Sequence, residues 1–251
     1  MIENNTSKLI GVGEDGINLI DTIKRKLNNN VDFEKIFPHQ DVDKDYVREL
    51  LDGVEILFLT YNSEDKSALQ IVNAIYYMAK ERRVLSIGID ISKKENSNSV
   101  NIDREFKIHE NNIVENFINI MLDSIDNMCT IGIDITDLKE VIAIDSGIKY
   151  TYKEFNIDNK KHEIVDKLFD SLNELGTYSE NKKGIIFIEG SSKVDLYYLN
   201  DILSIIQDKL DLSYNLMFSL YLKEDLGEKI NIGLVINYKV GILNSNFLIY
   251  N

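Results

Sequence analysis

Short apolar runs alternate with helical periodicity through the first half of the chain. The runs at 8–13, 54–61 and 83–90 predict buried strands, and 105–110 predicts a short one. After the first run, and again over 64–82, apolar residues recur every three or four positions, which predicts amphipathic helices. This alternation is typical of an α/β layer with a mostly parallel sheet.

The second half of the chain follows a different rhythm, which indicates an α+β domain. Its predicted strands lie at 147–155, 184–190, 215–222 and 231–238, with helices near 160–175 and 195–210. Between the two halves, 111–129 has apolar residues at helical spacing on both sides, which predicts a helix packed between two bodies. We therefore expect a nucleotide-binding-type domain over 1–110, a central helix over 111–130 and a C-terminal domain over 131–251.

Composition narrows the class of protein. The 251 residues are 44% hydrophobic and 28% charged, as in a globular protein. With 42 acidic against 28 basic residues the net charge is −14, which argues against nucleic-acid or anionic-membrane partners. The polar start and the absence of a long apolar run predict neither a signal peptide nor a membrane span, so we expect a cytoplasmic protein.

A glycine-rich turn follows the first predicted strand. Gly11, Gly13 and Gly16 fit the pattern G-x-G-x-x-G, in which glycines let backbone N–H groups approach phosphate at a helix N-terminus. Asp32 follows at a spacing near that of a ribose-binding acid. Taken alone, the pattern indicates either a dinucleotide site or a tight turn without a ligand. An NAD-dependent oxidoreductase is the weakest hypothesis, because the chain offers no convincing proton donor or substrate site.

Four segments, in order along nearly the whole chain, resemble the FtsZ/tubulin superfamily. KLIGVGEDGINLI resembles its first phosphate loop, and 47–90 resembles its succession of helix, strand, phosphate loop, helix and strand. IGIDITDLKEVI at 131–142 resembles the synergy loop, and 182–237 resembles the C-terminal activation domain. The resemblance implies a tubulin/FtsZ-like α/β fold: a Rossmann-type N-terminal domain with a parallel sheet, a central helix and an α+β C-terminal domain.

The resemblance also implies roles for individual residues. Gly11, Gly13, Gly16 and Asn18 would contact GTP or GDP with its Mg²⁺. Asp134 and Asp137 match the catalytic carboxylates that act in trans on the GTP of a neighbouring subunit. A structural alternative stays open, in which Asp137 caps a helix and Glu140 completes a capping box.

Departures from the family pattern lie at both phosphate loops. The glycine signature expected after the strand at 54–61 is YNSEDKSAL, and Glu14 and Asp15 replace glycines of the first loop. A carboxylate beside phosphate costs about 1–4 kcal/mol at effective dielectric constants of 80 to 20. Alternatively, Glu14, Asp15, Glu64 and Asp65 complement helix dipoles and replace a lost anion. We expect no cofactor and no metal site, with weak GTP binding at most and GTPase activity lost or weak.

The leading hypothesis is an FtsZ-like assembly protein that is a pseudo-GTPase. It would self-associate head to tail, or bind and regulate FtsZ filaments. The alternative is an active GTPase that forms cytoskeletal filaments in cell division or DNA segregation. Only KVGILNSNFLIYN follows residue 238, so we expect no C-terminal adaptor-binding peptide.

Overall fold

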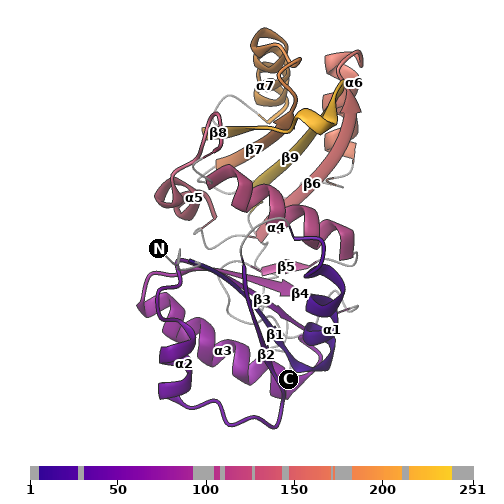
Figure 1. Ribbon diagram of the computed structural model, residues 1–251. Coiled ribbons are helices and arrows are strands. Elements are labelled where there is room, and N and C mark those ends of the chain that lie inside the picture. The colour runs from indigo at the N-terminus through magenta and orange to yellow at the C-terminus, as the bar shows by residue number, and fades with distance from the viewer. Residues whose placement is uncertain are drawn as a thin grey trace, which may run out of the picture.

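A computed structural model describes most of the chain as two β-sheets with a helix between them (Figure 1). The segment after residue 238, where the sequence predicts no adaptor-binding peptide, lies outside the described residues. The described residues are 6–27, 31–92, 105–107, 111–125, 128–142, 147–170, 172, 183–210 and 215–238.

The first sheet has five parallel strands in the order β2-β1-β3-β4-β5. All-parallel pairing confirms the α/β architecture predicted for the first half of the chain, with every predicted strand present. One further strand, β2, was not predicted, because only Ile36 of its five residues is buried. The elements are β1 (Ser7–Val12), α1 (Gly13–Ile23), β2 (Asp32–Ile36), α2 (Lys44–Leu50), β3 (Ile56–Tyr61), α3 (Lys66–Glu81), β4 (Leu85–Asp90) and β5 (Glu105–Lys107).

The second sheet is mixed and has the order β6-β9-β7-β8. Strand β9 pairs antiparallel with both β6 and β7, whereas β7 and β8 are parallel. The antiparallel pairing of β9, with helices packed against the outer face of the sheet, agrees with the α+β architecture predicted for this half. The elements are α4 (Asn111–Ile125), α5 (Ile135–Ile142), β6 (Gly147–Asn156), α6 (Lys161–Asp170), β7 (Lys183–Gly190), α7 (Leu196–Leu210), β8 (Asn215–Leu222), the 3₁₀ turn η1 (Glu224–Leu226) and β9 (Lys229–Tyr238).

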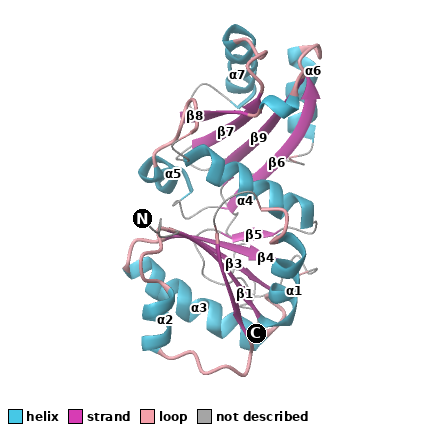
Figure 2. Ribbon diagram, viewed as in Figure 1, coloured by secondary structure: helices cyan, strands magenta, loops and turns pink. Residues whose placement is uncertain are grey.

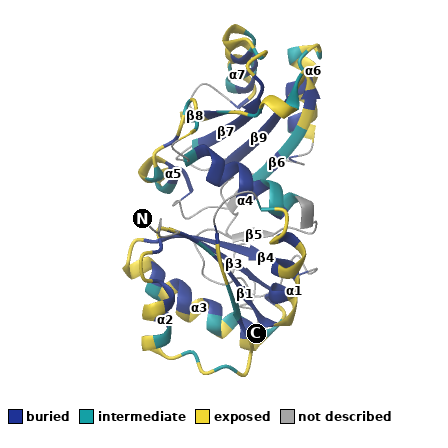
Figure 3. Ribbon diagram, in the orientation of Figure 1, coloured by how far each residue is buried: buried dark blue, intermediate teal, exposed yellow. Residues whose placement is uncertain are grey.

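Three hydrophobic clusters stack the elements in layers (Figure 2). Neighbouring strand residues point to opposite faces, so Leu9 packs toward α1 and α4 while Ile10 packs toward α2 and α3. The outer face of the second sheet packs against α6 and α7 through a third cluster. The helices that cover each outer side keep an exposed polar face, and strands β1, β3, β4 and β7 between them are almost fully buried (Figure 3).

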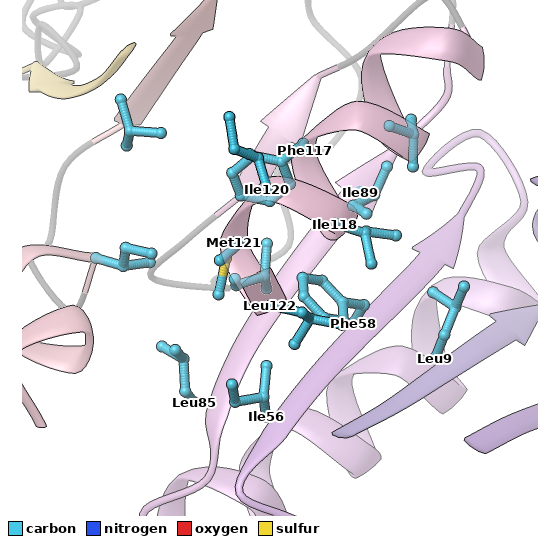
Figure 4. Close-up of a cluster of buried hydrophobic side chains, with 14 of the residues drawn as sticks. Leu9, Ile56, Phe58, Leu85, Ile89, Phe117, Ile118, Ile120, Met121 and Leu122 are labelled. Atoms are coloured by element: carbon cyan, nitrogen blue, oxygen red, sulfur yellow. The ribbon is translucent and has the colours of Figure 1, made fainter. Parts of the chain in front are cut away.

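Helix α4 is apolar on both sides, as its sequence predicts, because it contacts both sheets. Phe117 packs edge-on against Phe58 of the first sheet, with ring centroids 6.4 Å apart, and against Tyr150 of the second, at 5.0 Å. Figure 4 shows Phe117, Ile118, Met121 and Phe58 in this shared cluster. The two sheets therefore share one core through α4.

Buried charges also join α4 to the second sheet. Lys223 Nζ lies 2.9 Å from Asp123 of α4 and 2.6 Å from Glu189 of β7. Both carboxylates are almost fully buried, and Asn231 and Tyr152 donate further hydrogen bonds to Glu189. Burial lowers the pKa of Lys223, but Glu189 and then Asp123 outweigh burial and hold that pKa above its ordinary value.

Candidate functional site

The glycine turn lies at the carboxyl edge of the parallel sheet, where α1 follows β1 without a loop. Two of its glycines are required by packing. A Cβ on Gly16 would lie 2.2 Å from the carbonyl oxygen of Thr60, and one on Gly11 would lie 2.8 Å from the carbonyl oxygen of Gly16. Thr60 Oγ1 also donates to Gly16 O at 3.0 Å. These glycines let α1 press directly onto β3, whether or not a ligand is bound.

Gly13 has a different role, at the meeting point of two helices. Its φ of +75° lies in the left-handed region, which other residues adopt only at a cost. A Cβ there would lie 3.1 Å from Ala68 Cβ and 3.2 Å from Asp65 Oδ2, both in the segment that begins α3. The starts of α1 and α3 therefore converge at Gly13, with the Asp65 carboxylate beside it.

The loop after β3 holds its own amide groups in hydrogen bonds. Asp65 caps α3, since its Oδ1 accepts from Ser67 N at 2.9 Å and from Ala68 N at 3.2 Å. Glu64 N donates to Asn62 Oδ1 at 2.9 Å, and Asp65 N donates to Asn62 O at 3.0 Å. Ser63 N donates to a buried carboxylate at 3.0 Å. Five amides that could face a phosphate are therefore already satisfied by oxygens of this chain.

The buried carboxylate is Asp90, at the end of β4. Its Oδ1 accepts from the amides of Ser63 and Ser92, and its Oδ2 accepts from the hydroxyls of the same two serines. Across the edge, Asn62 Nδ2 donates to Asp15 Oδ2 at 2.7 Å. The side chains of Asn62 and Asp90 thus help to tie together the segments that follow β1, β3 and β4.

The four predicted carboxylates lie where the sequence places them. Glu14 and Asp15 are exposed in the first turn of α1, Glu64 is exposed just before α3, and Asp65 is the cap of α3. Negative charge therefore lies at both helix N-termini that would face a phosphate.

Two other residues predicted to contact a nucleotide, Asp32 and Asn18, do not lie in the glycine turn. Asp32 pairs with Lys8 at the start of β1, four register steps before the turn, which is about 13 Å away at the strand rise. The interpretation of Asp32 as a ribose-binding acid is therefore wrong. Asn18 is exposed on α1, one turn after Glu14, and its carbonyl accepts from Thr22 Oγ1.

Asp134 and Asp137 lie together at the start of α5. Asp134 is the cap: its Oδ1 accepts from Thr136 N at 2.7 Å and its carbonyl accepts from Leu138 N. Hydrogen bonds from the backbone and the side chain of Thr136 hold the pKa of Asp134 below its ordinary value. The cap predicted at Asp137 is wrong, and Glu140 contacts Lys183 at 3.4 Å instead of completing a capping box. Both aspartates remain exposed.

Helix α5 lies on the opposite side of the molecule from the carboxyl ends of β1 and β3 (Figure 1). The glycine turn and the aspartate pair therefore belong to two different ends, and one copy cannot bring them together.

Sequence reasoning missed Asn62 and Asp90 as determinants of the edge. A usable signal was present, because each comes at the end of a strongly apolar strand, and strand ends gather at one edge of a parallel sheet. Among the described residues, no three His, Cys, Asp or Glu side chains gather to hold a metal ion. No described helix combines the length and hydrophobicity of a membrane span.

A cavity of about 640 Å³ lies elsewhere, between the start of α6 and α7. Two pairs of its lining residues contact each other: Lys161 contacts Asp201, and Tyr198 donates to Asn159 O at 3.4 Å. It contains none of the residues predicted from the sequence, so it is not the candidate site.

Solved structures share this architecture. An empty FtsZ dimer from M. jannaschii aligns with TM-score 0.67 and 11% identity, over 93% of this chain and 88% of that one. GDP-bound monomeric CetZ1 from Haloferax volcanii gives 0.61 and 10%, over 95% and 96%. TubZ of Clostridium botulinum phage c-st gives 0.56 and 10%, over 94% and 93%.

At the level of sequence, neither a protein-family model nor a curated protein matches the chain. The structural likeness extends over nearly the whole chain and over both sheets. It confirms the fold implied by the four resembling segments: the chain has the tubulin/FtsZ-like fold.

Proposed function

We propose that this protein is an FtsZ-like assembly protein that self-associates head to tail in the cytoplasm without GTP. The observation that carries the proposal is that the loop amides at the carboxyl edge already donate hydrogen bonds to oxygens of this chain. A phosphate-binding loop must offer free amides, whereas Ser63, Glu64, Asp65, Ser67 and Ala68 donate theirs within the chain. A nucleotide would have to displace these bonds before binding.

Charge adds to this barrier. A triphosphate at the edge would approach the carboxylates of Glu14, Asp15, Glu64 and Asp65. Each carboxylate at about 4 Å would cost roughly 1–4 kcal/mol, depending on the effective dielectric constant. The glycine turn gives little support for a ligand, since Gly11 and Gly16 are explained by packing.

Head-to-tail contact is supported by the placement of two distinct ends. A heterologous contact between unlike surfaces can repeat along a chain of subunits. The edge around Glu14 and the start of α5 lie on opposite sides of the molecule, so a second copy can join them by translation. The FtsZ structure from M. jannaschii is described as an empty dimer.

Two measurements test the proposal. Calorimetry of nucleotide-stripped protein with GTP and Mg²⁺, with GDP and NAD for comparison, should show no saturable binding. Sedimentation velocity should show concentration-dependent assembly that GTP does not change. Micromolar GTP binding accompanied by phosphate release would instead establish the active GTPase.

End variants test the geometry of assembly. Glu14→Trp and Asp137→Trp each enlarge one exposed end, and the natural chain has no tryptophan to confuse the fluorescence. Each variant alone should fail to form chains, while an equal mixture should form dimers through the two unmodified ends. Dimers of either variant alone would contradict a head-to-tail contact.

A second candidate function rests on the exposed pair Asp134 and Asp137. Because the amides at this chain's own carboxyl edge are occupied, these carboxylates would act on the nucleotide bound at the end of a true FtsZ filament. Wild-type protein should then change FtsZ GTP turnover, and the double substitution by Ala should remove that change. An unchanged GTPase rate with the wild-type protein would exclude this role.

A further inference from the structure

We propose that the side of β8 that faces away from β7, here called the open edge, pairs with β8 of a second copy. The contact is symmetric, because each copy contributes the same strand. It goes beyond the proposed function, since a symmetric contact closes on itself whereas a head-to-tail contact repeats. Where both contacts form, the symmetric one links two head-to-tail chains.

Backbone groups point away from the sheet at alternate residues of the open edge. Strand β8 is the last strand of the second sheet (Figure 1). The N–H and the C=O of Leu220 both bond to Ile131, in the segment before α5. Because backbone groups alternate sides along a strand, those of Leu216 and Phe218 also face away from β7. Along the described chain, the backbone partners on this side are Thr130 and Ile131, and both meet Leu220.

The open edge lacks the charges that keep an edge strand from pairing. Of the edge strands that the structure describes, β2, β5 and β6 contain both lysine and carboxylate residues, whereas the eight residues of β8 contain neither. The side chains of Phe218 and Leu222 are 37% and 41% exposed. An uncharged, apolar edge of this kind is a template for another strand.

The length of the open edge favours a second copy as its occupant. Ile131 covers one end of the edge, which leaves 215–219 open. Two such strands pair antiparallel about Met217, so that Leu216 lies opposite Phe218 of the partner subunit. Their backbone groups then form hydrogen bonds in both directions, and Ile131 keeps its place in both copies.

Charge and size agree with this occupant. Two copies of net charge −14 repel each other, and they can approach most closely where neither carries a charge. A contact of about five residues a side is much smaller than the roughly 20–30 residues a side of a stable interface. The pairing is therefore transient between free subunits, and it becomes lasting only where head-to-tail chains hold many copies together.

Cysteine cross-linking tests the register. Met217 lies opposite Met217 of the partner subunit as a non-hydrogen-bonded pair, whose Cα separation of about 4.5 Å suits a disulfide. Met217→Cys, combined with Cys129→Ser to remove the natural thiol, should give a covalent dimer on oxidation with diamide. Asn215→Cys is the matched control. It is exposed on the same strand, but its two copies lie about 14 Å apart, so it should give about tenfold less dimer.

A charge on the open edge should prevent the cross-link. Phe218→Lys, added to Met217→Cys, should lower the yield of dimer about tenfold, because like charges meet across the paired strands. Tyr77→Lys adds the same charge at an exposed aromatic residue of α3 and should leave the yield unchanged. Glu14→Trp, which blocks head-to-tail chains, should also leave it unchanged. Failure of the proposed function is thereby distinguished from failure of this inference.

Hydrogen exchange provides a measurement without cysteine. In Glu14→Trp, the amides of Leu216 and Phe218 should become more protected as the protein concentration rises, because pairing occupies both. A cross-link at Met217→Cys that exceeds the Asn215→Cys control and is lost with Phe218→Lys would support the proposal. Equal yields from the two cysteines, or no effect of Phe218→Lys, would overturn it. If circular dichroism shows that Met217→Cys is unfolded, exchange decides, and protection that does not depend on concentration would overturn the proposal.

Discussion

The side-chain amide of Asn62 donates a 2.7 Å hydrogen bond to Oδ2 of Asp15, across the edge where two helices begin. The same Asn62 accepts from Glu64 N through its Oδ1. One residue thereby fixes its own loop and ties that loop to the first turn of α1. Through this bond the neutral Asn62 amide partly offsets the charge of Asp15, at an edge that also carries other carboxylates.

Replacing that donor by a carboxylate should destabilise the fold. Asn62→Asp keeps an acceptor for Glu64 N but places a second negative charge against Asp15. We expect the free energy of unfolding to fall by about 1 kcal/mol at pH 7, the size of a hydrogen bond lost at a partly buried site. Urea unfolding measures the change.

Asn73→Asp is the matched control for net charge. Asn73 is exposed in the middle of α3. Its variant should lose less than about 0.5 kcal/mol, as is usual for surface substitutions. Equal losses in the two variants would mean that the Asn62–Asp15 contact contributes nothing specific.

Lys223 should contribute more than any exposed lysine. Lys223→Met leaves Asp123 and Glu189 buried without their shared cation. Removing one partner of a buried pair costs roughly 3–5 kcal/mol, so a loss of about 3 kcal/mol is expected because Lys223 itself is partly exposed. Lys229→Met breaks an exposed pair with Glu154 and should cost less than about 1 kcal/mol.

The same contact predicts a pH dependence with a definite sign. The pKa of Lys223 is raised in the folded protein, so its stabilisation is complete below the ordinary value of 10.5. It is lost as the pH rises through the higher folded pKa. Above pH 10.5 the wild type should lose stability more steeply than Lys223→Met; parallel curves would contradict the assignment.

The strands and helices could be predicted because their buried residues are apolar and recur at regular spacing in the sequence. Strands β3 and β4 are mostly apolar and are buried at every position. Strand β2 has no such apolar pattern, because it lies at the sheet edge and its residues Asp32 and Phe33 are exposed. The same error put Asp32 at the wrong edge of the sheet.

The candidate site could be predicted only in outline. Helix-start acids such as Glu14 follow from sequence alone, once the helix is placed. The contact between Asn62 and Asp15 spans 47 residues, and the bonds of Asp90 to Ser63 span 27. Such partners depend on strand order, which local patterns do not encode.

Gly16 should be required for stability in the absence of any nucleotide. In Gly16→Ala, the new Cβ would lie 2.2 Å from Thr60 O, so α1 would have to move away from β3. Overpacking of this kind costs roughly 1–3 kcal/mol or more. Gly132→Ala is the control, because its Cβ would meet ordinary contacts at 3.5 and 3.8 Å. Equal urea midpoints for the two variants would contradict the packing role.

We expect the Asp134 carboxylate to stabilise the fold as the cap of α5, and the exposed Asp137 carboxylate to contribute nothing to stability. Asp134→Ala removes the α5 cap and should lower the melting temperature, while Asp134→Ser should restore it and Asp137→Ala should leave it unchanged. The pKa of Asp134 is lowered from 3.8, so its stabilisation is present above that pH and is lost as the pH falls through the folded pKa. Thermal melts between pH 2 and 7 test this dependence, which should be absent in Asp134→Ser. If Asp137→Ala lowers the melting temperature as much as Asp134→Ala does, the assignment of the cap is wrong. If Asp137→Ala instead weakens assembly in sedimentation without changing stability, Asp137 belongs to the contact between subunits.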